Sequence, residues 1–179
     1  MIDGEPAGKT AGTPAPRQPG SGRSGAVAQQ RLAARLAAVQ ALYQLEASGE
    51  DAQQVVTQFL AERLEEEIDG VSLVAADRKL FGRLVTAIAE EGDALDGLLA
   101  PYLPQEWVLQ RVEPLLRIIL RAAAYELRAT PQVPAKVVIA QYVAVTEAFH
   151  EPQETGFVNK LLDRLARSLR PADFAGASG

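Results

Sequence analysis

The arginines near the start of the chain are the residues whose type and spacing point most directly to a chemistry. Arg31 and Arg35 lie one helical turn apart. Three further basic residues precede them: Lys9, Arg17 and Arg23. Residues 1–36 hold five of the 18 basic residues but only two of the 23 acidic ones, in a chain of net charge −5. A positive arm on a negative body is typical of phosphate binding, although a solubilising tail with a solvated helix flank would account for the same charges.

Side chains suited to catalysis or metal binding are scarce. The chain has no cysteine, and His150 is its only histidine, which excludes a disulfide framework, a thiolate metal site and a pair of histidines. The segment GSGRSG, residues 20–25, has the glycine spacing of a dinucleotide-binding loop, but it follows no predicted strand and opens no βαβ unit. We therefore expect neither a metal site nor a cofactor.

The composition favours a single all-helical domain. Ala, Leu, Glu and Arg dominate, and 179 residues suffice for one full hydrophobic core. No apolar run reaches the length that spans a bilayer, and the first ten residues lack the apolar centre of a signal peptide. We expect a cytoplasmic protein without a membrane partner.

The segment Leu115–Leu127 (LLRIILRAAAYEL) predicts a central buried helix, because it is apolar on almost every side. Its basic residues Arg117, Arg121 and Arg128 fall within a wedge of about 40° and form one seam that reaches water. Glu126 points away from this seam into apolar surroundings. It therefore requires a partner, or it lies at a frayed helix end.

The remaining apolar periodicity predicts the walls around this helix. A first helix from about Ala26 to Gly49 buries a stripe that ends at Tyr43, and no segment gives a trusted strand signal. The other expected helices follow Asp51, run from Leu73 to about Glu91 with a break or bend at Gly92, continue from Asp93, cover residues 137–149, and run from Thr155 or Gly156 to Leu169. We expect about seven helices in a bundle of two sub-bundles over residues 26–171, with disordered tails at 1–25 and 172–179.

Four runs in this order resemble the NusB transcription antitermination family. They are RLAARLAAVQALYQLEAS, ILRAAAYEL, VPAKVVI and GFVNKLLDRLAR, and the resemblance covers roughly Arg31 to Pro171. The most specific elements are AVQALYQ (Ala38–Gln44), LRxAxYEL (Leu120–Leu127) and FVNxxLD (Phe157–Asp163). Each is only a short helical motif, so the resemblance rests on the order and spacing that these motifs share with the family.

The resemblance implies an all-α fold of two sub-bundles without enzymatic activity. It further implies binding of boxA-type RNA together with the ribosomal protein NusE, and loading onto RNA polymerase to suppress premature termination, notably in ribosomal RNA operons. The RNA-binding positions it implies are Arg31, Arg35, Gln153, Gly156 and Phe157. The region that would dock NusE contains Tyr102, Trp107 and Glu113. The free protein is expected to be a monomer or a weak homodimer.

Other interpretations of the same residues remain open. Trp107 could be an anchor over the core edge, and Phe157 could belong to the core with Val158 and Leu161. The chain could be a helical protein–protein adaptor without RNA binding. It could also be a stand-alone relative of the RNA-binding domain of ribosomal RNA cytosine methyltransferases, which would need a separate catalytic domain.

Overall fold

A computed structural model describes residues 23–63, 66–73 and 76–176 of the chain. The expected tail at residues 1–22 lies outside the described residues. Residues 23–25, which we expected to be disordered, already belong to the first helix.

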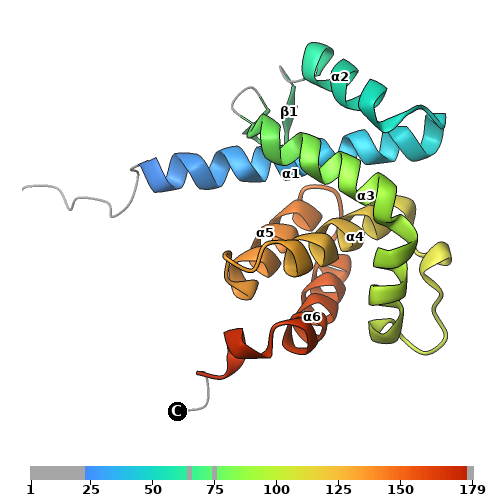
Figure 1. Cartoon of the computed structure of the whole chain (residues 1–179), viewed down its shortest axis with the longest axis vertical. Coiled ribbons are helices and arrows are strands. Elements are labelled where there is room, and N and C mark those ends of the chain that lie inside the picture. The colour runs from blue at the N-terminus through green and yellow to red at the C-terminus, as the bar shows by residue number, and fades with distance from the viewer. Residues whose placement is uncertain (1–22, 64–65, 74–75, 177–179) are drawn as a thin grey trace, which may run out of the picture.

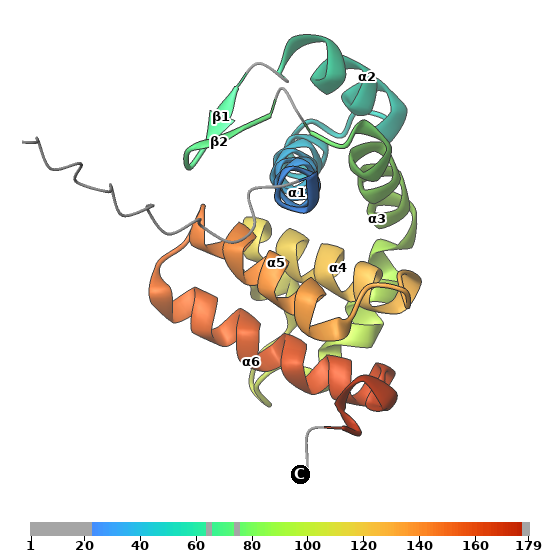
Figure 2. The same cartoon turned by 90° about the vertical axis from the view of Figure 1, so that its left-hand side faces the viewer.

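Within the described residues the chain forms six α-helices and three short 3-10 helices, which confirms the expected all-α class. The α-helices are α1 (Arg23–Ser48), α2 (Ala52–Glu62), α3 (Arg78–Leu99), α4 (Pro114–Ala129), α5 (Ala135–Glu147) and α6 (Pro152–Leu169). The 3-10 helices are η1 (Ala100–Tyr102), η2 (Leu109–Arg111) and η3 (Pro171–Phe174). Figures 1 and 2 show α1, α2 and the start of α3 grouped above α4, α5 and α6.

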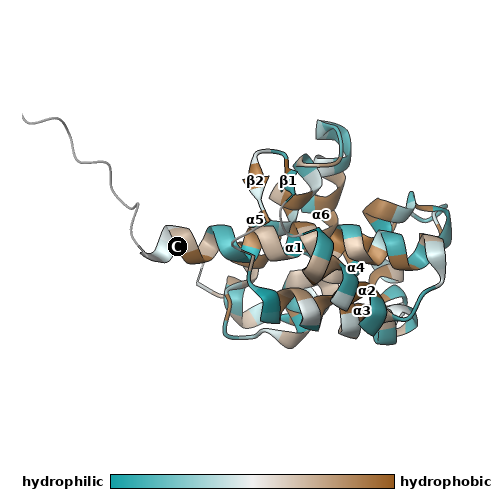
Figure 3. Cartoon of the chain, turned by 90° about the horizontal axis from the view of Figure 1, so that it is seen from above, coloured by the Kyte–Doolittle hydropathy of each residue, from teal (hydrophilic) through white to brown (hydrophobic). Residues whose placement is uncertain are grey.

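Helix α4 is the centre of the fold, as its sequence predicts. It packs against α1, α3, α5 and α6, and Ile118, Ile119 and Leu120 are buried. The helix begins where Glu113 caps it and Pro114 occupies the first turn, a position at which proline costs no hydrogen bond. Figure 3 shows hydrophilic and hydrophobic stretches alternating along the helices, as expected for amphipathic helices around one core.

Helix α1 is buried through its middle, but the last residue of the predicted apolar stripe is exposed to solvent. Leu36 and Val39 are buried as expected, whereas Tyr43 is 48% exposed. The expectation that Tyr43 is buried is therefore wrong. Tyr43 lies two turns after Leu36 on the same helix face, and that face is open to solvent there.

A short β-hairpin follows α2, contrary to the expectation of no strand. Strand β1 (Glu67–Ile68) pairs antiparallel with β2 (Val71–Ser72). The two turn residues, Asp69 and Gly70, both have positive φ, which is the backbone geometry that tight hairpin turns need. The signal is hard to recognise in the sequence because each strand has only two residues.

Helix α3 begins later and runs further than expected. It starts at Arg78, where the side chain of Asp77 accepts a hydrogen bond from the backbone N–H of Leu80 at 3.0 Å. It then continues through Gly92 to Leu99, so the two expected segments are one helix. Figure 1 shows its second half running in a different direction from its first half, which agrees with a bend rather than a break.

The C-terminal part is more ordered than expected. Helix α6 begins at Pro152, three residues before the predicted start, and η3 follows it where we expected a disordered tail. The Asp173 carboxylate of η3 accepts a hydrogen bond from the backbone N–H of Ala135 at 2.8 Å, so η3 is fixed to the start of α5. Residues 177–179 lie outside the described residues.

Among the described helices, none combines the length and the apolar character needed to cross a membrane.

Candidate RNA- and partner-binding groove

A groove of about 670 Å³ lies between the segment that precedes α4 and the first turns of α6. Its walls carry four of the residues expected at RNA or partner surfaces: Trp107, Glu113, Gln153 and Phe157. Gly156 precedes Phe157 on α6, and the space beside its Cα is open. The fold thus brings residues of both expected surfaces, distant in the sequence, to one place.

Two aromatic rings meet in this groove. The ring centroids of Trp107 and Phe157 are 5.3 Å apart and the rings are inclined by 43°. Trp107 is 51% exposed, and Phe157 is half-buried against the core. The pair therefore presents aromatic surface to solvent, and neither ring is sealed in the core.

Glu113 is held at the groove by three residues around its carboxylate. It accepts hydrogen bonds from the backbone N–H groups of Leu115 and Leu116 at 3.0 and 2.9 Å, and it lies 3.0 Å from Nε2 of His150. Burial acts to raise the pKa of Glu113, but the hydrogen bonds from His150 and from the two backbone N–H groups outweigh it and lower the pKa. The groove therefore carries a fixed carboxylate at neutral pH.

Two further polar atoms of the groove have no partner. Nδ1 of His150 and Oε2 of Glu154 are buried, and neither has a hydrogen-bond partner within the described part of the chain. Buried polar atoms are nearly always hydrogen-bonded in folded proteins. These atoms could therefore serve a bound molecule.

Tyr102 lies outside the groove. It is half-buried at the end of η1, where the Arg164 guanidinium lies 5.8 Å from its ring centroid and Nη1 of Arg164 donates to its carbonyl oxygen at 3.4 Å. Tyr102 was expected in the same docking region as Trp107 and Glu113, but it does not share their pocket.

Arg35 is not at the surface, which corrects its expected role. Only 4% of the residue is exposed, and its Nε and Nη2 donate to the Glu126 carboxylate at 2.7 and 2.9 Å. The hydroxyl of Tyr142 donates to the same carboxylate at 2.6 Å, and Gln141 accepts from Nη1 of Arg35 at 3.3 Å. Arg35 is thus the partner that Glu126 requires, and its charge is neutralised by this buried ion pair.

Arg31 is exposed, but it lies far from Phe157. It borders a hollow of about 220 Å³ together with Thr130 and Gln132, at the C-terminal end of α4. Glu113 caps the opposite end of α4, and 16 helical residues span about 24 Å. The structure therefore places the expected RNA-binding residues at two separate positions.

The basic seam of α4 is neutralised. Arg117 and Arg121 each pair with Glu46 at 2.8 Å, and Arg121 also binds Asp96 at 2.6 Å. Arg128 pairs with Glu91. The seam joins α4 to α1 and α3, so its charges serve the fold.

The model of the NusB family matches residues 32–167, which is well over half of the chain. The chain belongs to the NusB family. The transcription antitermination protein NusB of Sinorhizobium fredii is 41% identical over 143 residues, covering 80% of this chain and 89% of that protein. The NusB protein of Bradyrhizobium sp. (strain ORS 278) is 43% identical over 143 residues, covering 80% and 85%.

A solved structure of NusB from T. maritima has the same fold. Its TM-score is 0.65 at 28% identity, and the match covers 80% of this chain and 96% of that one. The family resemblance and the all-α fold expected from the sequence are thereby confirmed.

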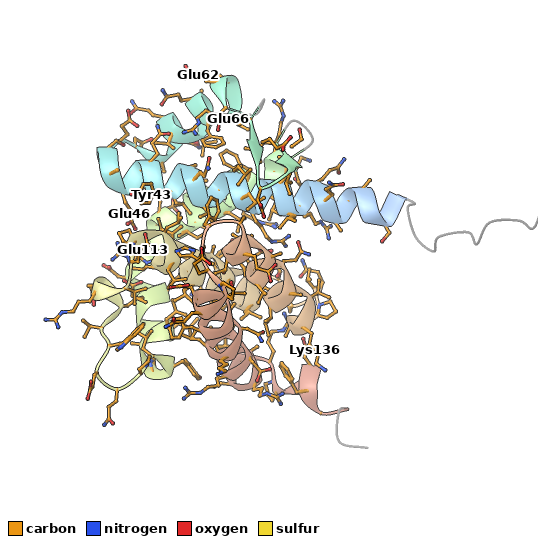
Figure 4. All side chains as sticks on the ribbon, turned by 180° about the vertical axis from the view of Figure 1, so that it is seen from behind. Tyr43, Glu46, Glu62, Glu66, Glu113 and Lys136 are labelled. Carbon is orange, nitrogen blue, oxygen red and sulfur yellow. The ribbon has the colours of Figure 1, made fainter. Side chains whose placement is uncertain are left out.

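Sequence periodicity missed one exposed aromatic residue of this NusB-family chain. Tyr43 is exposed, and Figure 4 shows it with Glu46 and Glu113 along one edge of the molecule. The ion pair between Glu46 and Arg117 agrees with this view, because Arg117 lies one turn after Glu113. Periodicity assigned Tyr43 to the core, so only its place in the AVQALYQ motif marked it out.

Proposed function

We propose that this chain is a transcription antitermination factor that binds boxA-type RNA together with NusE and loads onto RNA polymerase. The curated relatives are named as transcription antitermination proteins, and they match along most of their length. The groove gives this proposal a physical basis in the chain itself.

The observation that carries the proposal is the aromatic pair formed by the exposed Trp107 and the half-buried Phe157. Single-stranded RNA is bound largely by stacking of unpaired bases on aromatic side chains. The amide of Gln153 lies on the same wall and can donate to and accept from a base edge. Gly156 precedes Phe157, and the space beside its Cα is open.

The partner is proposed to dock along the neighbouring edge. Glu113 and the exposed Tyr43 lie there, and carboxylates at positions 106, 113 and 154 border the groove. A basic surface would complement these carboxylates, so NusE and RNA would meet at adjacent parts of one surface. That arrangement predicts that NusE raises the affinity for RNA.

The test measures the affinity for a boxA-type RNA oligonucleotide with and without NusE, at low and moderate salt. We expect NusE to strengthen binding and salt to weaken it. Phe157→Ala and Trp107→Ala should each weaken binding roughly 5- to 150-fold, since a stacked base contributes about 1–3 kcal/mol. Val137→Ala is the matched control, because Val137 is an exposed apolar residue at the start of α5 and does not line the groove.

A native chain that ignores RNA even in the presence of NusE would contradict the proposal. The acidic border of the groove would then favour the protein–protein adaptor. If Val137→Ala weakens RNA binding as much as Phe157→Ala does, the groove is not part of the RNA-binding surface.

A further inference from the structure

A cluster of basic side chains surrounds the small hollow near the start of α3. Arg31 from α1 and Lys79 and Arg83 from α3 border this hollow of about 220 Å³. All three residues are exposed, and none forms an ion pair with any residue that the structure describes. They differ in this from the arginines of α4, which are paired with carboxylates.

The backbone fixes the geometry of this cluster. Lys79 and Arg83 are four residues apart on α3, so they lie on the same helix face. The backbone N–H of Asp77 donates to the carbonyl oxygen of Gln30 at 3.0 Å, which ties the start of α3 to the turn of α1 that precedes Arg31. The backbone segments that carry the three basic side chains are therefore held next to each other.

The charges around the hollow leave it positive. Its floor contains Arg35 and Glu126, which neutralise each other. Asp77 is the remaining carboxylate, and it is engaged in capping α3 through the backbone N–H of Leu80. Three cations thus face one capped carboxylate.

Helix stability does not explain the presence of Lys79. Lys79 lies in the first turn of α3 beside the exposed Arg78, and that turn holds no acidic residue. The positive end of the helix dipole disfavours cations in the first turn and favours anions there. The residue choice suits an anion that binds from outside.

We infer that Arg31, Lys79 and Arg83 bind phosphate groups of the RNA backbone, at a position separate from the aromatic groove. The inference rests on the proposed RNA binding and deepens it. Lys and Arg contacts to phosphates hold an RNA in place without reading its sequence. The groove would recognise bases while this cluster holds the strand.

The test compares Lys79→Ala, Arg83→Ala and the double variant with the native chain in the presence of NusE. Two RNA oligonucleotides of equal length are used, one with a boxA element and one with its bases scrambled. Lys136→Ala is the control for each single variant, because Lys136 is an exposed lysine at the start of α5 without an ion pair in the described residues. A thermal melt of each variant checks that its fold is unchanged.

The readout is the slope of log affinity against log salt concentration. Each phosphate contact to a single strand contributes about 0.7 to this slope, so each single variant should lower it by about 0.7 and the double variant by about 1.4. At about 0.1 M salt the double variant should bind on the order of tenfold more weakly. The loss should be similar for both RNAs, and Lys136→Ala should cause neither effect.

The outcomes separate this inference from the proposed function. If the native chain binds boxA RNA and the double variant keeps the native slope, the phosphate site is wrong while the proposed function stands. A loss confined to the boxA RNA would also overturn it, because it would indicate base recognition. If the native chain binds neither RNA, the proposed function fails, and the phosphate site fails with it.

Discussion

The guanidinium of Arg35 on α1 and the carboxylate of Glu126 on α4 form a buried ion pair with two hydrogen bonds, at 2.7 and 2.9 Å. The residues are 91 positions apart in the sequence. Their pairing joins the two helical groups at the point where α1 crosses α4, and Tyr142 extends it to α5.

Breaking this pair should destabilise the protein strongly. Arg35→Met leaves the Glu126 carboxylate buried without its cation, and we expect the free energy of unfolding to fall by about 3–5 kcal/mol. The double variant Arg35→Met/Glu126→Leu should recover part of this loss, because no buried charge remains. Urea unfolding measures both, with the exposed Arg31→Met as a control that should change stability by at most about 0.5 kcal/mol. Equal effects at Arg35 and Arg31 would contradict the structural role of Arg35.

Tyr142 should make the protein sensitive to alkaline pH. Burial, together with the charge of Glu126, raises the pKa of its hydroxyl well above the usual value near 10. The folded state keeps the proton that the unfolded state releases, so this contribution is fully present below pH ~10 and is lost as the pH rises above it. The loss should reach about 1.4 kcal/mol per pH unit.

Tyr142→Phe should flatten this alkaline loss, although it removes a hydrogen bond and lowers stability at neutral pH by about 1–3 kcal/mol. Unfolding curves between pH 8 and 11 measure the slope. Tyr43→Phe, which changes an exposed tyrosine, should leave the slope unaltered. If the stability of the Tyr142→Phe variant falls with pH as steeply as that of the native protein, Tyr142 is not the cause of the alkaline loss.

Glu113 should contribute stability on the other side of the pH range. Its pKa is lowered in the folded state, so its contribution is present above the unfolded value of about 4.3 and is lost as the pH falls through the folded value. Glu113→Gln should cost up to about 1 kcal/mol at pH 7, because a neutral amide caps α4 less well. The two proteins should converge in stability as the pH falls below the lowered pKa of Glu113 in the folded state. Glu106→Gln, at an exposed position of the same groove, should show neither effect.

The carboxylate of Asp173 should stabilise the start of α5. Pro134 precedes this helix and has no side chain that can cap it, so the cap comes from Asp173 of η3, which lies 38 residues after Ala135. Asp173→Ala removes this hydrogen bond and the ion pair with Arg170, and should cost about 0.5–2 kcal/mol. Asp163→Ala breaks only an exposed pair on α6 and should cost less than about 0.5 kcal/mol. Thermal melts of both variants make the comparison.

Local periodicity was sufficient to predict most helices, because each apolar stripe reports the face that a helix buries. It placed α4 at the centre and recognised α5 as a helix despite its β-branched residues. It misplaced the first residues of α3 and α6, because the cap by Asp77 and the first-turn Pro152 decide where these helices begin. Tyr43 was assigned to the core because periodicity shows which helix face is apolar, but not how far along the helix other elements pack against that face.

The site depends on contacts that periodicity does not contain. Arg31 and Arg35 are both arginines on adjacent turns of α1. Arg31 is nevertheless exposed and Arg35 is buried, because Glu126 lies opposite Arg35 only. The requirement of Glu126 for a partner was visible in the sequence, but the identity of that partner was not. In the same way, nothing local to Trp107 indicates that Phe157 lies 5.3 Å away.

The separation of Arg31 from Phe157 at opposite ends of α4 sets a minimum footprint for the ligand. A strand that touches both ends must bridge about 24 Å, which takes about seven nucleotides if the bases stay stacked at roughly 3.4 Å each, and fewer if the strand is extended. Shorter oligonucleotides can occupy one end or the other but cannot gain from both. Affinity should therefore rise in a step, and not gradually, once the RNA exceeds this length.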